Sequence, residues 1–162
     1  MLRLRKPKPA DKKYFAKWWR DQELIKLTSG QLRRISDPVV DKSFWQILHS
    51  PKDFHYMITL GAKVIGHLAL VRSRLGWYET QIVIGEKKYW GQGYGTKAIK
   101  LLLSKVVRLG ISKIYLEVRP NNFRAIKAYE KCGFVGVGIK KYPKNKNLPQ
   151  TLKMVFNKIY EK

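Results

Sequence analysis

The chain has 162 residues, of which 44% are hydrophobic and 12% aromatic, so it is expected to form one globular domain and not to be disordered. Its 34 Lys and Arg against 11 Asp and Glu give a net charge of +23, which predicts anionic partners: phosphorylated cofactors, nucleic acid or the ribosome, anionic membranes or acidic proteins. The same charge argues against polyamines and aminoglycosides as substrates. The alternative is a lysine-rich proteome in which the charge serves solubility only.

Several classes of protein are excluded by what the sequence lacks. No apolar run has the length of a membrane span, and the basic segment 1–8 has no apolar segment behind it, so it is no secretory signal. The single cysteine, Cys132, permits no internal disulfide and predicts a cytoplasmic protein. The three histidines, His49, His55 and His67, are scattered, and no metal site is expected.

The first half of the chain reads as helices followed by a hairpin. Asp11 is expected to cap a helix that carries aromatic residues at helical spacing: Tyr14, Phe15, Trp18 and Trp19. Further helical segments are expected over 21–27 and 41–48. Alternating hydrophobicity predicts strands over 54–60 and 64–71, joined by a tight turn at Gly61, and a third strand over 77–84.

The second half alternates helices with strands. An amphipathic helix is predicted over 96–109, with Gly110 at its end and with six inward-facing residues: Ala98, Ile99, Leu102, Leu103, Val106 and Val107. A strand over 113–118 completes a strand–helix–strand crossover. Asn122 is expected to cap a helix over 123–131, and closing strands follow at 134–141 and 151–156. The chain is therefore predicted to be a single α/β (α+β) domain over 1–162, with a mixed central β-sheet flanked by helices.

Three glycines, Gly91, Gly93 and Gly95, lie between the strand that ends at Ile84 and the helix that begins at Thr96. Glycines let the backbone approach a ligand closely, and a helix behind them adds free N–H groups and a positive dipole end. This arrangement predicts a pyrophosphate site. The alternatives are a glycine-rich surface turn and a dinucleotide site, G-x-G-x-x-A at 93–98 with Glu117 as its acidic residue. The dinucleotide alternative is disfavoured, because six residues separate strand from glycines and only 64 residues follow Ala98.

Two motifs in this order resemble the Gcn5-related N-acetyltransferases. The first is Tyr-Trp-Gly-Gln-Gly-Tyr-Gly-Thr-Lys-Ala at 89–98, similar to the ribosomal-protein serine and aminoglycoside branches. The second begins with Leu-Glu-Val-Arg at 116–119 and continues through Asn122 and Tyr129, similar to the ribosomal-protein alanine N-acetyltransferases. The resemblance spans roughly Val64 to Phe156. One residue departs from it: Trp90 stands where the family usually has Gln or Arg, a side chain that an amide cradle does not need.

The resemblance implies acetyl-CoA as the co-substrate. Its pyrophosphate would accept hydrogen bonds from the amides of Gly91, Gln92, Gly93, Tyr94, Gly95 and Thr96. Its pantetheine arm would pair like a strand with the backbone of Val83, Ile84 and Gly85, where neighbouring parallel strands splay apart. Outer phosphates would meet three lysines: Lys88, Lys97 and Lys131. Asn122 would either touch the cofactor or serve only as a helix cap.

Acetyl transfer to an amine needs a base for the amine proton and benefits from an acid for the departing thiolate. Tyr129 fits the acid, because it follows Asn122 by two helical turns and by resemblance faces the sulfur; the alternative is a core tyrosine. Glu117 fits the base, because it lies near the end of its strand, twelve residues before Tyr129; the alternative is a surface glutamate. Glu79 is the second candidate base. Cys132 is expected to be packed, not catalytic.

The predicted activity is direct, acetyl-CoA-dependent N-acetyl transfer in a ternary complex. The favoured acceptor is a protein N-terminal amine, for instance of a ribosomal protein. The alternatives are an amine on a small anionic molecule, such as an amino-sugar nucleotide, and a catalytically quiet acyltransferase-fold module that binds RNA. Two segments are expected to border the acceptor, 27–42 and 142–150, and neither carries a readable specificity code.

Overall fold

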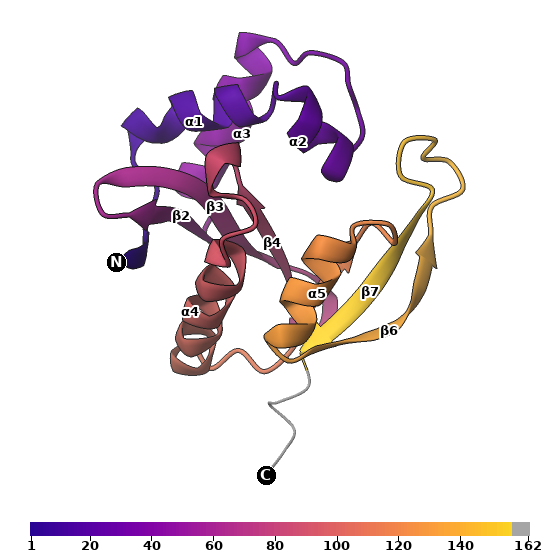
Figure 1. Ribbon diagram of the computed structural model, residues 1–162. Helices are drawn as coiled ribbons and strands as arrows, with labels where there is room; N and C mark the ends of the chain where they lie inside the picture. The colour runs from indigo at the N-terminus through magenta and orange to yellow at the C-terminus, as the bar shows by residue number, and fades with distance from the viewer. Residues whose placement is uncertain (157–162) are drawn as a thin grey trace.

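The computed structural model describes residues 1–156, which form one seven-stranded mixed sheet covered by helices (Figure 1). The strands are β1 (Leu2–Arg5), β2 (Phe54–Leu60), β3 (Lys63–Arg72), β4 (Tyr78–Ile84), β5 (Ile114–Val118), β6 (Phe134–Lys141) and β7 (Gln150–Phe156). The helices are α1 (Lys12–Trp18), α2 (Gln22–Leu27), α3 (Asp37–His49), α4 (Tyr94–Arg108) and α5 (Phe123–Lys131), with short 3-10 turns η1 (Pro9–Asp11), η2 (Arg74–Gly76) and η3 (Lys87–Tyr89). The predicted class is confirmed; residues 157–162 of the predicted domain lie outside the described residues.

Two elements differ from the prediction by more than two residues at one end. The strand β1 was not expected; it pairs antiparallel with β2, and its Leu2 and Leu4 pack against the core, which the alternation of leucine with arginine allows. The helix α3 begins at Asp37, four residues earlier than predicted. Ser36 occupies its N-cap position, and Pro38 lies in its first turn, where a missing N–H costs nothing.

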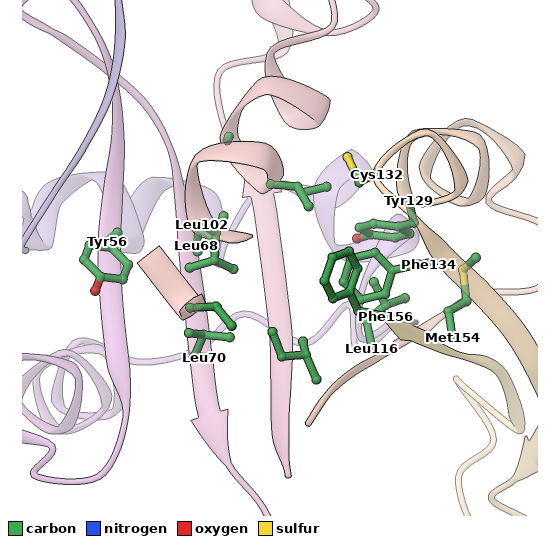
Figure 2. Packing of buried hydrophobic residues seen from close by; sticks show 14 of the residues in the cluster. Tyr56, Leu68, Leu70, Leu102, Leu116, Tyr129, Cys132, Phe134, Met154 and Phe156 are labelled. Atoms are coloured by element: carbon green, nitrogen blue, oxygen red, sulfur yellow. The ribbon is translucent and has the colours of Figure 1, made fainter. Parts of the chain in front are cut away.

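Both faces of the sheet are covered, and the larger core lies beneath α4 and α5. Figure 1 shows these two helices together on one side, with α1, α2 and α3 grouped near β2, β3 and β4. The larger core includes Leu102, Leu116 and Phe134, and Figure 2 shows part of it. Five of the six residues of α4 predicted to face inward are buried or half-buried, but Val107 is 73% exposed, so the prediction was wrong at this edge of the stripe.

The sheet opens between its two central strands, β4 and β5. They form its one parallel pairing within the described residues, and it covers only two registers, Tyr78 with Ile114 and Glu79 with Tyr115. Beyond Glu79 the two strands separate, so their backbone groups are unpaired on the facing edges. The hydroxyl of Thr80, the next residue of β4, is the one buried side-chain polar atom without a partner in residues 1–156. This fork between β4 and β5 is where a strand-like ligand would add to the sheet.

Asp11 does not cap α1 as predicted. Its side chain accepts no hydrogen bond from the first turn of α1; the carboxylate instead receives both terminal nitrogens of Arg5 at 2.8 Å and the amide of Lys8 at 2.7 Å. Burial alone would raise the pKa of Asp11, but these partners outweigh it and hold the pKa below its usual value. The residue therefore ties β1 to η1 by a half-buried ion pair.

Two histidines form a neutral pair between β2 and β3. His55 Nδ1 lies 3.1 Å from His67 Nε2, the rings are stacked, and Phe15 of α1 meets the ring of His67 edge-on. Burial, followed by the neighbouring His55, lowers the pKa of His67 to about 3, and burial also lowers the pKa of His55. Both imidazoles are therefore neutral in the fold at neutral pH.

This pair is expected to make the protein less stable in acid. The unfolded chain binds a proton at His67 near pH 6.5 and the folded chain only near 3, so the free energy of unfolding falls as pH falls through this window, by up to about 1.4 kcal/mol per pH unit. Urea unfolding of His67→Gln should show a shallower slope between pH 6.5 and 4.5 than wild type. His49→Gln, which changes an exposed histidine, should keep the wild-type slope; equal slopes in all three proteins would contradict the assignment.

Candidate active site

The glycine loop ahead of α4 has the backbone that an anion cradle needs. Gly91 and Gly93 have φ of +72° and +77°, and a Cβ on either would meet no atom within 4 Å, so their outer side is open. Gly93 is the N-cap of α4 and offers no capping side chain, so the amides of the first helical turn remain free donors at the positive end of the helix dipole. Gly95 lies inside α4 itself. The loop therefore fits a pyrophosphate.

The other predicted members of the cradle surround this turn. Tyr94 and Thr96 lie with Gly95 in the first turn of α4, and Gln92 donates to the carbonyl of Lys88 at 2.6 Å, which braces the loop. The side chains of Lys88 and Lys97 lie over the rings of Tyr89 and Tyr94, respectively, at 5.2 and 5.5 Å. These two lysines thus flank the loop, as outer phosphates would require.

The predicted pantetheine residues lie at the open edge of β4, where successive carbonyls face opposite sides. The carbonyl oxygen of Val83 lies against Gly66 of β3, which leaves no room for a Cβ there. The carbonyl of Ile84 faces the fork and accepts a hydrogen bond from the indole of Trp90 at 2.7 Å. Gly85 is pressed against the ring of Trp18, so that no side chain fits. The backbone of Ile84 thus faces the fork, where the indole of Trp90 occupies its carbonyl, whereas the carbonyl of Val83 faces β3, so the prediction that Val83 pairs with the pantetheine arm does not fit.

Tyr129 and Asn122 both belong to α5. The Asn122 side chain accepts the amide of Ala125 at 3.3 Å, so it caps α5 as one of the two alternatives predicted. The ring of Tyr129 lies edge-on to Phe134 at 6.0 Å, with Cys132 nearby (Figure 2). Burial, and then the neighbouring Cys132, raise the pKa of Tyr129 well above its usual value, so its hydroxyl is a proton donor throughout the physiological range. Burial also raises the pKa of the Cys132 thiol, which argues against a cysteine nucleophile.

Glu117 of β5 is held by three groups from the β6–β7 hairpin. Its Oε1 accepts the hydroxyls of Tyr142 at 2.5 Å and Thr151 at 2.6 Å, and its Oε2 lies 3.5 Å from Lys140 Nζ. Burial would raise the pKa of Glu117, but the hydroxyl bonds and the lysine charge outweigh it, so the pKa lies below its usual value. Glu117 is therefore a fixed negative charge and a weak proton acceptor.

Glu79 lies in the last register before the fork, opposite Tyr115. Glu117 follows Tyr115 by two residues, so both carboxylates lie on the sheet face opposite α4 and α5. Burial and, second, the charge of Glu117 raise the pKa of Glu79, and Glu79 forms no ion pair with any residue of 1–156. A carboxylate with a raised pKa is suited to accept a proton.

Comparison with known families decides between the expectations. A family model described as "Acetyltransferase (GNAT) domain" matches residues 1–135. The chain belongs to the GNAT acetyltransferase family. It is thereby an acyltransferase with acetyl-CoA as its co-substrate, and the glycine loop and the fork are the features of its structure that suit this molecule.

Two relatives match parts of this GNAT protein. N-alpha-acetyltransferase RimI of Mycobacterium tuberculosis is 31% identical over 110 residues, 65% of this chain and 66% of that protein. The uncharacterized protein MJ1062 of Methanocaldococcus jannaschii is 36% identical over 56 residues, 35% of this chain and 12% of that protein. The chain thus covers less than two thirds of the length of either.

Solved structures share the fold at low identity. The aminoglycoside acetyltransferase AAC(6')-Ib, bound to ribostamycin and coenzyme A, has a TM-score of 0.81 at 20% identity, covering 97% of this chain and 93% of its own. Spermidine N-acetyltransferase of Vibrio cholerae, bound to CoA and spermine, has a TM-score of 0.80 at 21% identity, covering 95% and 93%. At such identities these likenesses establish the GNAT fold and not the acceptor.

One residue of the site escaped the sequence reasoning. Arg119, at the end of β5, donates from Nε to the carbonyl of Thr28 at 2.8 Å and from Nη2 to the carbonyl of Asn147 at 3.0 Å. It thereby clasps the two predicted acceptor segments, the chain after α2 and the β6–β7 loop, which projects beyond the sheet on the side of α2 in Figure 1. Gly30 lies so close that a Cβ would collide with the guanidinium. In the sequence, the only indication of this role is that an arginine follows Glu117 by two residues, a spacing that places both side chains on the same face of a strand.

Within this GNAT site, Tyr129→Phe is expected to lower kcat about tenfold or more while the affinity for acetyl-CoA is kept. The substitution removes the only proton that the ring can give to a departing thiolate, and acid–base groups typically contribute about 10²–10⁴-fold, part of which water can replace. Steady-state kinetics and calorimetry of the same preparations measure the two effects. A kcat within twofold of wild type would make Tyr129 a core residue only.

Proposed function

We propose that this protein transfers the acetyl group of acetyl-CoA directly to a protein N-terminal amine. The observation that carries the proposal is the carboxylate pair, Glu79 and Glu117, at the fork of a chain whose net charge is +23. An ammonium group is repelled by most of this surface and attracted to these two carboxylates, so an amine at the end of a neutral or acidic body fits better than a polycation. The likeness to an N-alpha-acetyltransferase supports the same acceptor class.

The two carboxylates divide the work in this proposal. Glu117, ionised and fixed by Tyr142 and Thr151, holds the incoming ammonium in place. Glu79, with the raised pKa, takes the proton that the amine must lose before it attacks, directly or through one water. Bound acetyl-CoA supplies the activated acyl carbon, and Tyr129 gives a proton or a hydrogen bond to the sulfur that departs.

Glu117→Gln is expected to lower kcat/KM by a factor that stays constant with pH. The amide removes the fixed negative charge without removing the base, so it weakens acceptor binding equally at every pH. The measurement is a pH–rate profile of both proteins with one acceptor peptide, from pH 6 to 9. If the loss is instead deepest at low pH and recovers as pH rises, then Glu117 is itself the base.

Further partners and the location belong to the same proposal. The β6–β7 hairpin carries Lys140, Lys141, Lys144 and Lys146 beside the acceptor side, which favours an acceptor presented on the ribosome or on another nucleic-acid surface. None of the helices in the described part of the chain is both long and apolar enough to cross a bilayer, and no three His, Cys, Asp or Glu side chains in residues 1–156 gather as a metal would require.

A cytoplasmic location is proposed from the single, buried cysteine.

The acceptor is tested by mass spectrometry of an amine panel incubated with acetyl-CoA. The panel contains peptides with free N-termini, including ribosomal-protein N-termini, the same peptides with blocked N-termini but free lysines, an amino-sugar nucleotide, spermidine and an aminoglycoside. We expect acetylation of free N-termini only. Modification of the amino-sugar nucleotide alone would favour a small anionic acceptor. No thioester consumption on any amine, together with salt-steep RNA binding, would favour a quiet RNA-binding module.

A further inference from the structure

Trp90 occupies a backbone group at the open edge of β4. The amide of Tyr78 donates to the carbonyl of Lys113, just before β5, at 2.9 Å, so backbone groups of alternate residues along β4 face β5. By this alternation the carbonyl of Ile84 faces the fork, and there the indole nitrogen of Trp90 donates to it at 2.7 Å. The bond is short and partly buried, which makes it a well-formed hydrogen bond.

The same indole is held from the opposite side of the fork. The guanidinium carbon of Arg124, in the first turn of α5, lies 4.4 Å from the centre of the Trp90 ring, a cation–π contact. Trp90 itself follows η3, in the loop that leads from β4 to the glycine cradle. The ring therefore bridges the loop after β4 and the start of α5, across the end of the fork that lies nearest the cradle.

We propose that Trp90 is a latch on the fork between β4 and β5, that is, a side chain that must leave the Ile84 carbonyl before the cofactor can pair there. The Ile84 carbonyl is one of the backbone groups of β4 that face β5 and that an arm added as a strand would use, and the indole N–H already donates to it. Binding of acetyl-CoA then exchanges the indole bond for a bond from a pantetheine amide, and the indole moves off the carbonyl. The inference rests on the proposed course of the pantetheine arm along β4. Trp90 acts here as a positioning residue that sets cofactor affinity and entry rate.

The test is Trp90→Phe, which removes the N–H donor but keeps an aromatic ring for Arg124. The latch predicts tighter CoA binding by calorimetry, roughly twofold to tenfold, because one competing hydrogen bond of ordinary net strength is lost. Association in stopped-flow mixing should be faster by a similar factor. The matched control is Trp45→Phe, an exposed tryptophan of α3, which should leave both values unchanged. Equal or weaker CoA binding by Trp90→Phe would overturn the latch.

A second measurement needs no variant that folds well. The chain has five tryptophans, and the indole N–H resonance of Trp90 should shift on CoA titration of ¹⁵N-labelled wild-type protein as it leaves the carbonyl, and should exchange faster with solvent. If no indole N–H resonance shifts at saturating CoA, the latch is overturned while the proposed cofactor site stays intact. If wild type bound no CoA at all in calorimetry, both the proposed cofactor site at the fork and the latch would be contradicted.

Discussion

Gly93→Val is expected to reduce the affinity for acetyl-CoA by roughly 10²-fold or more. The N-cap of α4 has a φ of +77°, which a β-branched residue adopts only with strain, and a side chain there would stand in the open space where the pyrophosphate approaches. Two charge-assisted hydrogen bonds of about 1.5–3 kcal/mol each are lost when the phosphates are kept away from the amides. Calorimetry with coenzyme A measures the loss directly.

The control separates the loss of the cradle from backbone strain. Gly61, in the turn between β2 and β3, also has a positive φ, +59°, and open space around its Cβ position, but no ligand is expected there. Gly61→Val should lower the melting temperature about as much as Gly93→Val and leave CoA affinity near that of wild type. Equal CoA affinities of Gly93→Val and wild type would show that the pyrophosphate does not bind at this loop.

Glu79→Gln is expected to lower kcat/KM for acetyl transfer by about 10²-fold near neutral pH, since a positioned base contributes roughly 10²–10⁴-fold. The effect should be largest above the pH at which Glu79 is protonated and below the pH at which most of the acceptor amine is neutral, and part of the rate should return as pH rises further. The raised pKa of Glu79 places its own titration closer to neutrality, so the acid limb of the wild-type profile should be absent from the variant.

Two comparisons make this prediction specific. Glu130→Gln, on the exposed side of α5, removes one carboxylate of the same type and should change neither kcat nor the pH profile. CoA affinity should be unchanged in Glu79→Gln, because the carboxylate lies on the sheet face opposite α4 and α5, where the acceptor is proposed to bind. A loss that is independent of pH in Glu79→Gln, combined with a pH-dependent loss in Glu117→Gln, would reverse the roles given to the two residues.

The sequence predicted the elements closely and the environments of the site residues poorly. Strands such as 54–60 and the helix 123–131 follow from local periodicity and caps, and the structure has them at the same bounds. The state of Glu117 depends on Tyr142 and Thr151, which lie 25 and 34 residues away, so no local pattern could show that its carboxylate is already engaged. The same holds for Trp90: the sequence marks it as unusual, but only the path of β4 brings its indole to the Ile84 carbonyl.

The clasp at Arg119 bears on how acceptor preference can change. Its two hydrogen bonds end on the main-chain carbonyls of Thr28 and Asn147, and every residue type supplies such a carbonyl. The exposed side chains of both acceptor segments can therefore vary, provided that Tyr142 and the buried Val40 are kept, Gly30 stays small and the two carbonyls keep their places. A library that randomises these side chains around a constant arginine would sample new amines without dismantling the frame. Variants selected for new acceptors are therefore expected to change these side chains and to keep Arg119.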